Sequence, residues 1–254
     1  MPGSPSSADA VLQVTNLTKR YGRLTALGDV SFSVRPGEIL GVIGPNGSGK
    51  TTLFECLAGV LPADSGTVSS AGRTIDVSDR SAVLFYLPDA IAPWPAQSVR
   101  WALAFAQGFF RAGVRRRAGP LSAPTDVIAR FDLAPILDDA IGTLSKGQRK
   151  RALLALSFLM PQRVLLADEP FEGLDLRQTR EVASALREEA AGGRTLVLSI
   201  HQIPDAARIC DRFVLLSAGR VCGEGTLDDL CGMAASRSAS PDRRDLEEVF
   251  LALT

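Results

Sequence analysis

Apolar runs along the chain predict a largely parallel β-sheet with helices between its strands. Residues 11–17 and 29–34 alternate between apolar and polar positions, as half-buried strands do. Residues 38–43, with the sequence EILGVI, form a continuous apolar run that ends in a glycine-rich loop, which is typical of a buried parallel strand. Helical patterns separate the later runs, so we expect an α/β fold with a mostly parallel sheet. The later runs cover residues 82–87, 164–167 and 195–200.

Residues 88–160 depart from this pattern. They contain no convincing strand, and helical patterns cover residues 101–110, 125–131 and 146–159. We therefore expect a helical subdomain, inserted between two strands of the sheet. Within it, residues 111–117 (RAGVRRR) are expected to form an exposed loop, either solvated or in contact with acidic headgroups or a partner.

Composition then narrows the class of protein. A chain of 254 residues that is 46% hydrophobic is too apolar for a disordered protein and long enough for one large domain, although residues 1–9 are Ser/Pro-rich and expected to be disordered. No uncharged stretch reaches the roughly 20 residues of a membrane-spanning helix. The 28 basic and 28 acidic residues balance, which gives no electrostatic case for binding nucleic acid. The start of the chain lacks a signal-peptide pattern and the four cysteines form no CxxC pair, so we expect buried, reduced thiols in an intracellular protein.

A phosphate-binding motif lies between the predicted strand at 38–43 and a helical run. Residues 44–51, GPNGSGKT, match G-x-x-x-x-G-K-[ST], in which glycines let backbone N–H groups turn toward phosphate oxygens. The helix that begins near Lys50 adds its positive end, Lys50 supplies a charge to the outer phosphates, and Thr51 offers its hydroxyl to Mg²⁺. The motif predicts a bound nucleoside triphosphate. The contacts are expected from Gly44, Pro45, Asn46, Gly47, Ser48, Gly49, Lys50, Thr51 and Thr52.

Two acidic residues follow a later apolar strand. Residues 164–169 read VLLADE, so Asp168 and Glu169 stand at the carboxyl end of a strand, beside the phosphate loop of a parallel sheet. Asp168 suits Mg²⁺, through water. Glu169 lies one residue further along, where a carboxylate can orient an attacking water and take its proton.

These motifs together with residues 144–148, LSKGQ, resemble the ATP-binding subunit of an ABC transporter over about residues 11–252. The resemblance implies a P-loop NTPase core with antiparallel N-terminal strands, an ATPase domain over residues 10–232 that contains the helical subdomain, and a short tail over 233–254 that ends in a helix. Ser145 is also a suitable N-cap for the helix that follows it. The resemblance further implies that the start of this helix contacts ATP held by an opposite subunit. The residues concerned are Ser145, Lys146, Gly147 and Gln148, with Lys146 standing where the family usually has glycine.

Four further positions take their expected roles from the same resemblance. Tyr21 resembles the aromatic residue that stacks on adenine, and Asp175, in the GLD of residues 173–175, belongs to the loop that links two sites across a dimer. His201, 32 residues after Glu169, matches the histidine that contacts the γ-phosphate. Asp89 stands where the family usually has glutamine, and we hypothesise that it keeps a role on the Mg²⁺ side with altered coupling to the partner.

The implied mechanism has two subunits joined by ATP and separated by its hydrolysis, which drives a separate membrane-spanning partner from the inner face of the membrane. Residues 101–110 and the segment after Asp89 are where the partner docks in this family. Residues 219–230, GRVCGEGTLDDL, and the short tail resemble the ABC-2-type exporter branch, which favours export. Alternatives are a soluble ABC-type ATPase, or a regulatory ATP-binding subunit with weak hydrolysis. A generic P-loop kinase or GTPase leaves LSKGQ and the spacing of His201 unexplained.

Overall fold

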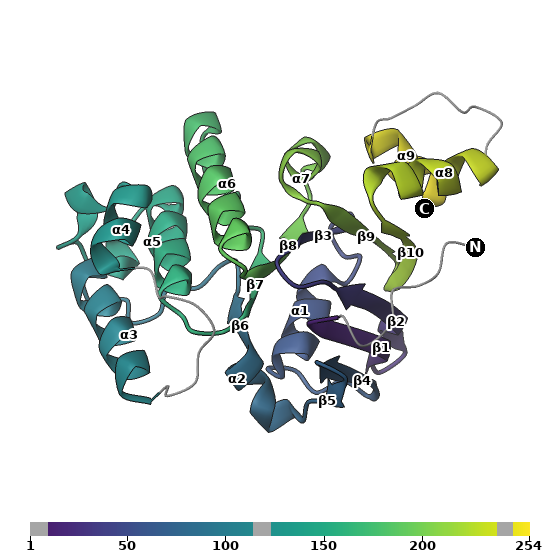
Figure 1. Cartoon of the computed structure of the whole chain (residues 1–254), viewed down its shortest axis with the longest axis horizontal. Coiled ribbons are helices and arrows are strands. Elements are labelled where there is room, and N and C mark those ends of the chain that lie inside the picture. The colour runs from purple at the N-terminus through teal and green to yellow at the C-terminus, as the bar shows by residue number, and fades with distance from the viewer. Residues whose placement is uncertain (1–9, 114–122, 238–245) are drawn as a thin grey trace.

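The computed structural model describes residues 10–113, 123–237 and 246–254 and arranges them around two sheets (Figure 1). The expectations for residues 1–9 and 114–117 lie outside the described residues. The larger sheet has the order β10-β9-β3-β8-β7-β6, in which all neighbours are parallel except the antiparallel edge strand β10. Its strands are β3 (Ile39–Ile43), β6 (Leu84–Leu87), β7 (Val164–Asp168), β8 (Thr195–Ile200), β9 (Arg212–Ser217) and β10 (Arg220–Gly225).

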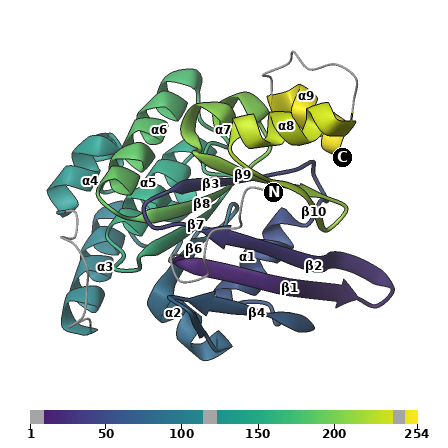
Figure 2. The ribbon, with the colours of Figure 1, turned by 45° about the vertical axis from the view of Figure 1, so that its right-hand side comes forward.

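The smaller sheet is antiparallel, in the order β2-β1-β4-β5. Helix α1 (Lys50–Ala58) lies between the two sheets, as Figure 2 shows from the side. Its side chains Leu53, Phe54 and Leu57 are fully buried in one core with apolar residues of both sheets. This packing holds the first turn of α1 at the edge where the parallel strands end. The strands of the smaller sheet are β1 (Leu12–Tyr21), β2 (Leu24–Val34), β4 (Ser65–Ser70) and β5 (Arg73–Thr74).

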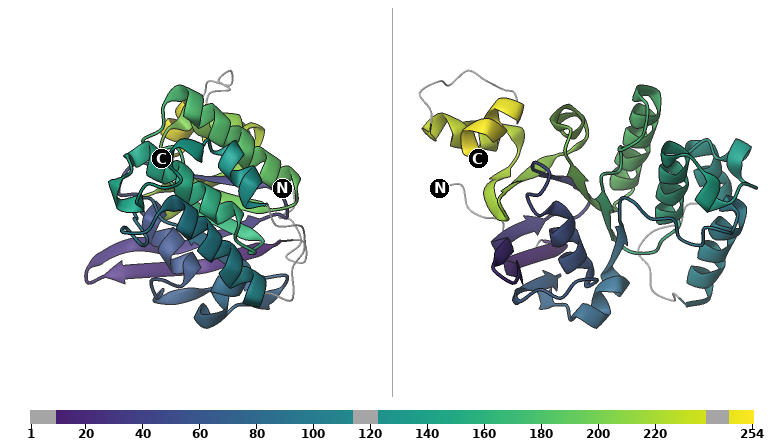
Figure 3. Two further views of the ribbon diagram at one scale, coloured as in Figure 1. Left: turned by 90° about the vertical axis from the view of Figure 1, so that its left-hand side faces the viewer. Right: turned by 180° about the vertical axis from the view of Figure 1, so that it is seen from behind.

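The predicted helical subdomain follows β6 and consists of α3 (Val99–Gly113), α4 (Pro124–Arg130) and α5 (Lys146–Phe158). These helices stand together at one end of the molecule, away from the C-terminal helices (Figure 3). The expectation of a loop from residue 111 is wrong for residues 111–113, because α3 continues through them. Arginine and alanine are good helix formers, so the helix extends beyond its apolar stretch.

Helices α6 (Leu176–Ala191) and α7 (Ile203–Ile209) cover the other face of the large sheet, and α8 (Leu227–Arg237) and α9 (Leu246–Leu253) lie at the C-terminal end. The short helix α2 (Arg80–Val83) packs beside α1 instead, and 3-10 turns lie at Val77–Asp79, Ala134–Ile136 and Ile141–Thr143. Helix α9 packs on α7 and α8 and buries three apolar side chains in the larger core. The boundary expected at residue 232 therefore falls inside α8.

Two further predictions from the sequence concern membrane-spanning helices and the burial of the cysteines. In the described ranges, helices that combine the length and the apolar character needed to cross a bilayer are not found. The structure describes all four cysteines and none of them is in a disulfide, but only Cys56 and Cys210 are buried, whereas Cys222 and Cys231 are partly exposed. The expectation of four buried thiols is thus wrong for the last two, because β10 is an edge strand and α8 lies at the surface.

Candidate functional site

A cleft of about 660 Å³ opens where the parallel strands end. The phosphate loop and the first turn of α1 form its floor. The ends of β6, β7 and β8 form one wall, with Asp89, Asp168, Glu169 and His201. The smaller sheet forms the other wall, where Tyr21 is the last residue of β1 before the hairpin turn. The topology therefore gathers residues from across the chain at one edge of the sheet, as the sequence predicted.

The phosphate loop depends on glycine at two positions. A Cβ on Gly44 would lie 2.2 Å from the Leu216 carbonyl oxygen, so this residue has no room for a side chain. Gly49 adopts a left-handed conformation (φ 106°), and a Cβ there would meet the Ala26 carbonyl oxygen at 2.7 Å. Helix α1 then begins at Lys50 with no side-chain hydrogen bond at its N-cap. Its first N–H groups are thus available to an anion in the cleft.

Lys50 lies in this floor and is almost fully buried. Its Nζ donates to the carbonyl oxygens of Gly44 (2.7 Å) and Pro45 (3.3 Å) and lies 3.8 Å from Glu169 Oε1. The neighbouring Ser48 Oγ is buried and has no hydrogen-bond partner among the described residues. Ser48 does not line the cleft and its Oγ lies against Gly44, so this hydroxyl is not directed at a bound phosphate. The free N–H groups at the start of α1 and the charge of Lys50 are what fit a phosphate chain.

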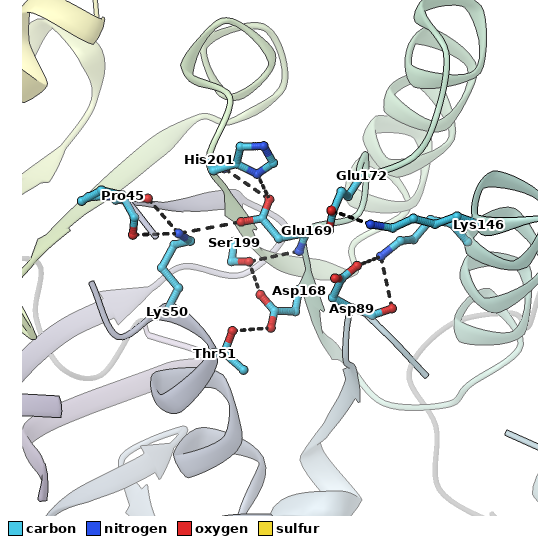
Figure 4. A network of polar contacts seen from close by, with 12 residues as sticks. Pro45, Lys50, Thr51, Asp89, Lys146, Asp168, Glu169, Glu172, Ser199 and His201 are labelled. Atoms are coloured by element: carbon cyan, nitrogen blue, oxygen red, sulfur yellow. Dashed lines mark hydrogen bonds and ion pairs between the residues drawn. The ribbon is translucent and has the colours of Figure 1, made fainter. Parts of the chain in front are cut away.

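Thr51 and Asp168 join the loop to β7. The Thr51 hydroxyl donates to Asp168 Oδ2 at 2.9 Å, and the Ser199 hydroxyl donates to Asp168 Oδ1 (Figure 4). Within the described ranges, groups of three or more His, Cys, Asp or Glu side chains that could hold a metal ion are not found. Two hard oxygen donors are what Mg²⁺ takes from a protein when phosphate and water supply its other ligands. Thr51 and Asp168 fit that role.

Glu169 follows Asp168 in a left-handed conformation (φ 48°) that is rare for residues other than glycine. Its backbone N–H donates to Ser199 Oγ at 3.0 Å, which holds the turn. Its side chain reaches His201, whose Nδ1 lies 2.6 Å from Glu169 Oε2. A strained residue that is fixed by its neighbours is typical of functional sites. Here the turn directs the Glu169 carboxylate into the cleft.

Asp89 lies on the same wall but is paired with a lysine. Lys150 Nζ donates to Asp89 Oδ1 at 2.6 Å, and Lys146 Nζ lies 2.5 Å from Glu172 Oε1. Burial would raise the pKa of the Asp89 carboxyl, but hydrogen bonding, first of all with Lys150, outweighs it and lowers the pKa below its ordinary value. The hydrogen bond to Glu172 raises the pKa of Lys146.

The start of α5 does not line the cleft of its own chain. Ser145 caps α5 as predicted, with its side chain accepting from the Gln148 N–H and the Gln148 side chain accepting from the Ser145 N–H. Asp175 caps α6 through the same arrangement with Gln178. Ser145 and Asp175 are exposed, and Gly147 lies against the backbone of Gly173. These residues thus form a surface beside the cleft, together with Lys146.

The remaining predicted residues lie along the cleft. Asn46, Gly47 and Thr52 line it with the rest of the loop. Tyr21 lines the opposite wall and is about half exposed, with Lys19 Nζ 5.6 Å from the centre of its ring. This wall also includes small and apolar residues at the ends of β2 and β9. They are Leu24, Thr25, Ala26, Ala218 and Gly219.

Sequence reasoning missed three side chains of this site. Ser199 bonds both Asp168 and Glu169, and its signal was a hydroxyl two residues before His201 at the end of an apolar strand. Lys150 was hidden in a basic run, RKR at 149–151, that reads as a solvated helix face. Glu172 had no signal of its own, because its partner comes from another element.

Comparisons with known proteins agree with this geometry. Residues 27–172 match the family model described as ABC transporter. The chain is 34% identical to the "Daunorubicin resistance ATP-binding protein DrrA3" of Streptomyces coeruleorubidus, over 88% of this chain and 70% of that protein. It is 33% identical to the "Phosphonates import ATP-binding protein PhnC" of Maricaulis maris, over 89% of this chain and 91% of that protein. A solved structure titled "Structure of ATP binding subunit of ABC transporter" superimposes with a TM-score of 0.80 and 28% identity, covering 96% of this chain and 99% of the other.

Proposed function

Because this chain belongs to the ABC transporter family of ATP-binding proteins, we propose that it binds ATP with Mg²⁺ and hydrolyses it to drive transport through a separate membrane partner. The observation that carries the proposal is the placement of Glu169. Its carboxylate lies in the cleft between Lys50 and His201, at the end of a phosphate loop. A carboxylate fixed in this position can orient a water molecule toward the outermost phosphate and accept its proton.

The chain's own residues divide the work in this proposal. The loop N–H groups, that of Ser48 included, and Lys50 bind the phosphates, and Tyr21 holds the base against the smaller sheet. Thr51 and Asp168 hold Mg²⁺, which supplies charge neutralisation on the phosphates. His201 fixes Glu169 through Nδ1–H, and donation from its other ring nitrogen to the γ-phosphate requires a proton on that nitrogen as well. Asp89 lines the same cleft, but its carboxylate is engaged by Lys150, so the Mg²⁺-side role expected from the sequence is not part of this proposal.

The position of α5 supports a site completed by a second subunit. Ser145 and Asp175 are exposed and do not line the cleft of their own chain. We propose that they contact ATP held by a partner subunit, so that ATP joins two subunits and hydrolysis releases them. Lys146, Gly147 and Gln148 belong to the same contact surface. The second subunit is either another copy of this chain or a related one.

An aromatic patch on the helical subdomain supports docking to a membrane partner. Trp101, Phe105 and Phe109 lie along one face of α3, and Trp94 packs edge-on against the first two. These four side chains are between 39% and 63% exposed. Clustered exposed aromatic side chains are typical of interaction surfaces. We propose that the chain binds there to the inner side of a membrane-spanning partner, and that replacing Trp101 and Phe105 with serine releases it from isolated membranes.

Export is the proposed direction, on the similarity to a resistance protein. The chain has a similar identity to an import protein, so the direction of transport is tested separately. Cells in which Glu169 is replaced by glutamine should become more sensitive to a toxic cargo if the protein exports it. Growth that fails for want of a nutrient would instead indicate import.

The first experiment compares Mg-ATP hydrolysis by the purified chain and by Glu169→Gln, with nucleotide binding and oligomeric state measured alongside. We expect hydrolysis to fall by at least about a hundredfold in the variant, because it loses its general base. We also expect the variant to bind ATP and to form an ATP-dependent dimer. Binding without hydrolysis by the wild-type chain would favour the regulatory alternative, and hydrolysis without any dimer would contradict the two-subunit site.

A further inference from the structure

Helix α5 carries two lysines one turn apart, and each is bonded to a carboxylate that lines the cleft. Lys150 Nζ lies 2.6 Å from Asp89 Oδ1, and Lys146 Nζ lies 2.5 Å from Glu172 Oε1. Residues four apart on a helix face the same side, so both pairs lie on one face of α5. Asp89, Lys146, Lys150 and Glu172 are called the charge quartet below (Figure 4).

The two carboxylates come from different parts of the α/β core. Asp89 follows β6, and Glu172 lies in the turn after β7, three residues beyond Glu169. Figure 4 shows Asp89, Lys146 and Glu172 side by side with Glu169 and Asp168, and Lys150 is bonded to Asp89. The quartet therefore connects the helical subdomain to the ends of two neighbouring strands, close to the residues that carry the proposed chemistry.

The backbone makes the same connection tight. A Cβ on Gly147 would lie 2.7 Å from the Gly173 carbonyl oxygen, and a Cβ on Gly173 would lie 2.8 Å from Lys146 Cγ. The first turn of α5 thus rests directly on the turn that follows Glu169. Because of this contact, α5 cannot rotate without displacing the turn after Glu169.

The two pairs differ in burial. The Lys150 side chain is 3% exposed and that of Asp89 is 26% exposed, whereas Lys146 and Glu172 are 48% and 36% exposed. Removing one partner of a buried pair leaves an uncompensated charge and is strongly destabilising, whereas an exposed pair contributes little to stability. The inner pair, Lys150 with Asp89, therefore contributes more to holding the helix in place. The outer pair, Lys146 with Glu172, can break and let both charges be hydrated by water.

We propose that the charge quartet is a set of positioning residues that fixes the first turn of α5 relative to Glu169 and thereby sets the rate of ATP turnover. The proposal rests on the proposed function. It assigns Asp89 to Lys150 rather than to Mg²⁺, which differs from the role that the sequence suggested. The two roles make opposite predictions about exchanging the charges.

The test compares kcat and KM for Mg-ATP in Asp89→Asn, Lys150→Met, and the charge exchange that combines Asp89→Lys with Lys150→Asp. We expect both single variants to lose kcat, on the order of tenfold, because misplaced reacting groups slow turnover. Their KM values should move in opposite directions, because one variant removes a negative charge near the phosphates and the other removes a positive one. The exchange, which keeps the net charge, should recover most of the lost kcat.

A matched control comes from an exposed ion pair of the helical subdomain. Arg100 and Asp138 form two hydrogen bonds at 2.8 and 3.0 Å and do not line the cleft. Asp138→Asn and Arg100→Met should leave kcat and KM unchanged. If the inner variants fail to fold, the outer pair of the quartet gives the same test through Lys146→Met and Glu172→Gln, for which we expect a kcat loss of a fewfold.

Three results would overturn the proposal. The first is a wild-type kcat in all quartet variants. The second is weaker Mg²⁺ binding by the Asp89 variants, seen as a higher Mg²⁺ concentration for half-maximal activity, with no recovery of kcat in the charge exchange. This result would assign Asp89 to the metal. The third is kcat values that follow net charge alone, rising in one single variant and falling in the other. If the wild-type chain does not hydrolyse ATP at all, the proposed function itself fails, which is a distinct outcome.

Discussion

His201 holds the Glu169 carboxylate through two contacts to the same oxygen. Its ring Nδ1 lies 2.6 Å from Glu169 Oε2, and its backbone N–H donates to that oxygen at 3.3 Å. A carboxylate only accepts, so Nδ1 carries the proton in this bond. The other oxygen, Oε1, faces Lys50 at 3.8 Å. The carboxylate is therefore held from two sides, and its orientation depends on a histidine that directly follows the neighbouring strand β8.

Replacing His201 with alanine removes the ring contact and leaves the backbone contact. We expect kcat to fall on the order of a hundredfold, because Glu169 loses its fixed orientation toward the attacking water. The KM for ATP should change little, since the loop and Tyr21 bind most of the nucleotide. Steady-state kinetics of His201→Ala beside Glu169→Gln test this. If the two residues act as one unit, the double variant should be no slower than the slower single variant; additive losses would contradict this.

Ser199 supports both acidic residues of the site. Its hydroxyl donates to Asp168 Oδ1 and accepts from the Glu169 N–H, and the side chain is fully buried. Ser199→Ala should leave both groups without this partner and reduce the free energy of unfolding by about 1–3 kcal/mol. It should also reduce kcat, because the turn at Glu169 loses a hydrogen bond. Urea unfolding measures the first effect and ATPase assays the second.

Ser157 provides the control for this prediction. It is also fully buried, but its hydroxyl donates only to the Leu154 carbonyl one turn earlier in α5. Ser157→Ala should be close to neutral in stability, since alanine favours the helix and the carbonyl is left in place. An equal loss in both variants would indicate that burial of a serine, and not its link to Asp168 and Glu169, determines the effect.

Local sequence patterns carried much of the fold and the phosphate loop. The strand expected at 195–200 has the same bounds as β8, and Ser145 caps α5 as expected, because both depend on residues close in the chain. The phosphate loop was predictable because its backbone conformation requires glycine at fixed positions, which leaves a recognisable sequence motif. In contrast, β4 (SGTVSS) is mostly polar and gains its stability by pairing with β1, so its own pattern does not reveal it. Strand β9 (RFVLLS) did carry an apolar run and was overlooked.

Ion pairs between residues that are far apart in the chain could not be predicted from local sequence patterns. Asp89 and Lys150 are 61 residues apart, and only the packing of α5 on the end of β6 brings them together. From the sequence, the Asp89 carboxylate was therefore predicted to be a metal ligand. A basic residue in a helix likewise reads as solvated until the tertiary structure buries it.

The cysteines allow a test of the core. Burial raises the pKa of the Cys56 thiol to about 11, and it also raises the pKa of Cys210. Since the thiolate is the reactive form, neither should react with a thiol reagent at pH 8 in the folded protein. At most Cys222 and Cys231 should react, and all four should react in denaturant. A third thiol that reacts rapidly in the folded state would contradict the placement of α1 or of β9 against α7.

Tyr21 allows base binding to be separated from catalysis. The ring lies at the cleft wall, and Lys19, which does not line the cleft, holds its Nζ 5.6 Å from the ring centre. Stacking of a base on this ring would contribute to binding in the ground state and the transition state alike, so its loss should raise KM and leave kcat unchanged. For Tyr21→Ala we expect a rise in KM of about 3- to 10-fold, the equivalent of one aromatic pair. Tyr21→Phe keeps the ring and should behave as wild type. A loss of kcat in Tyr21→Ala, or an unchanged KM, would remove Tyr21 from base binding.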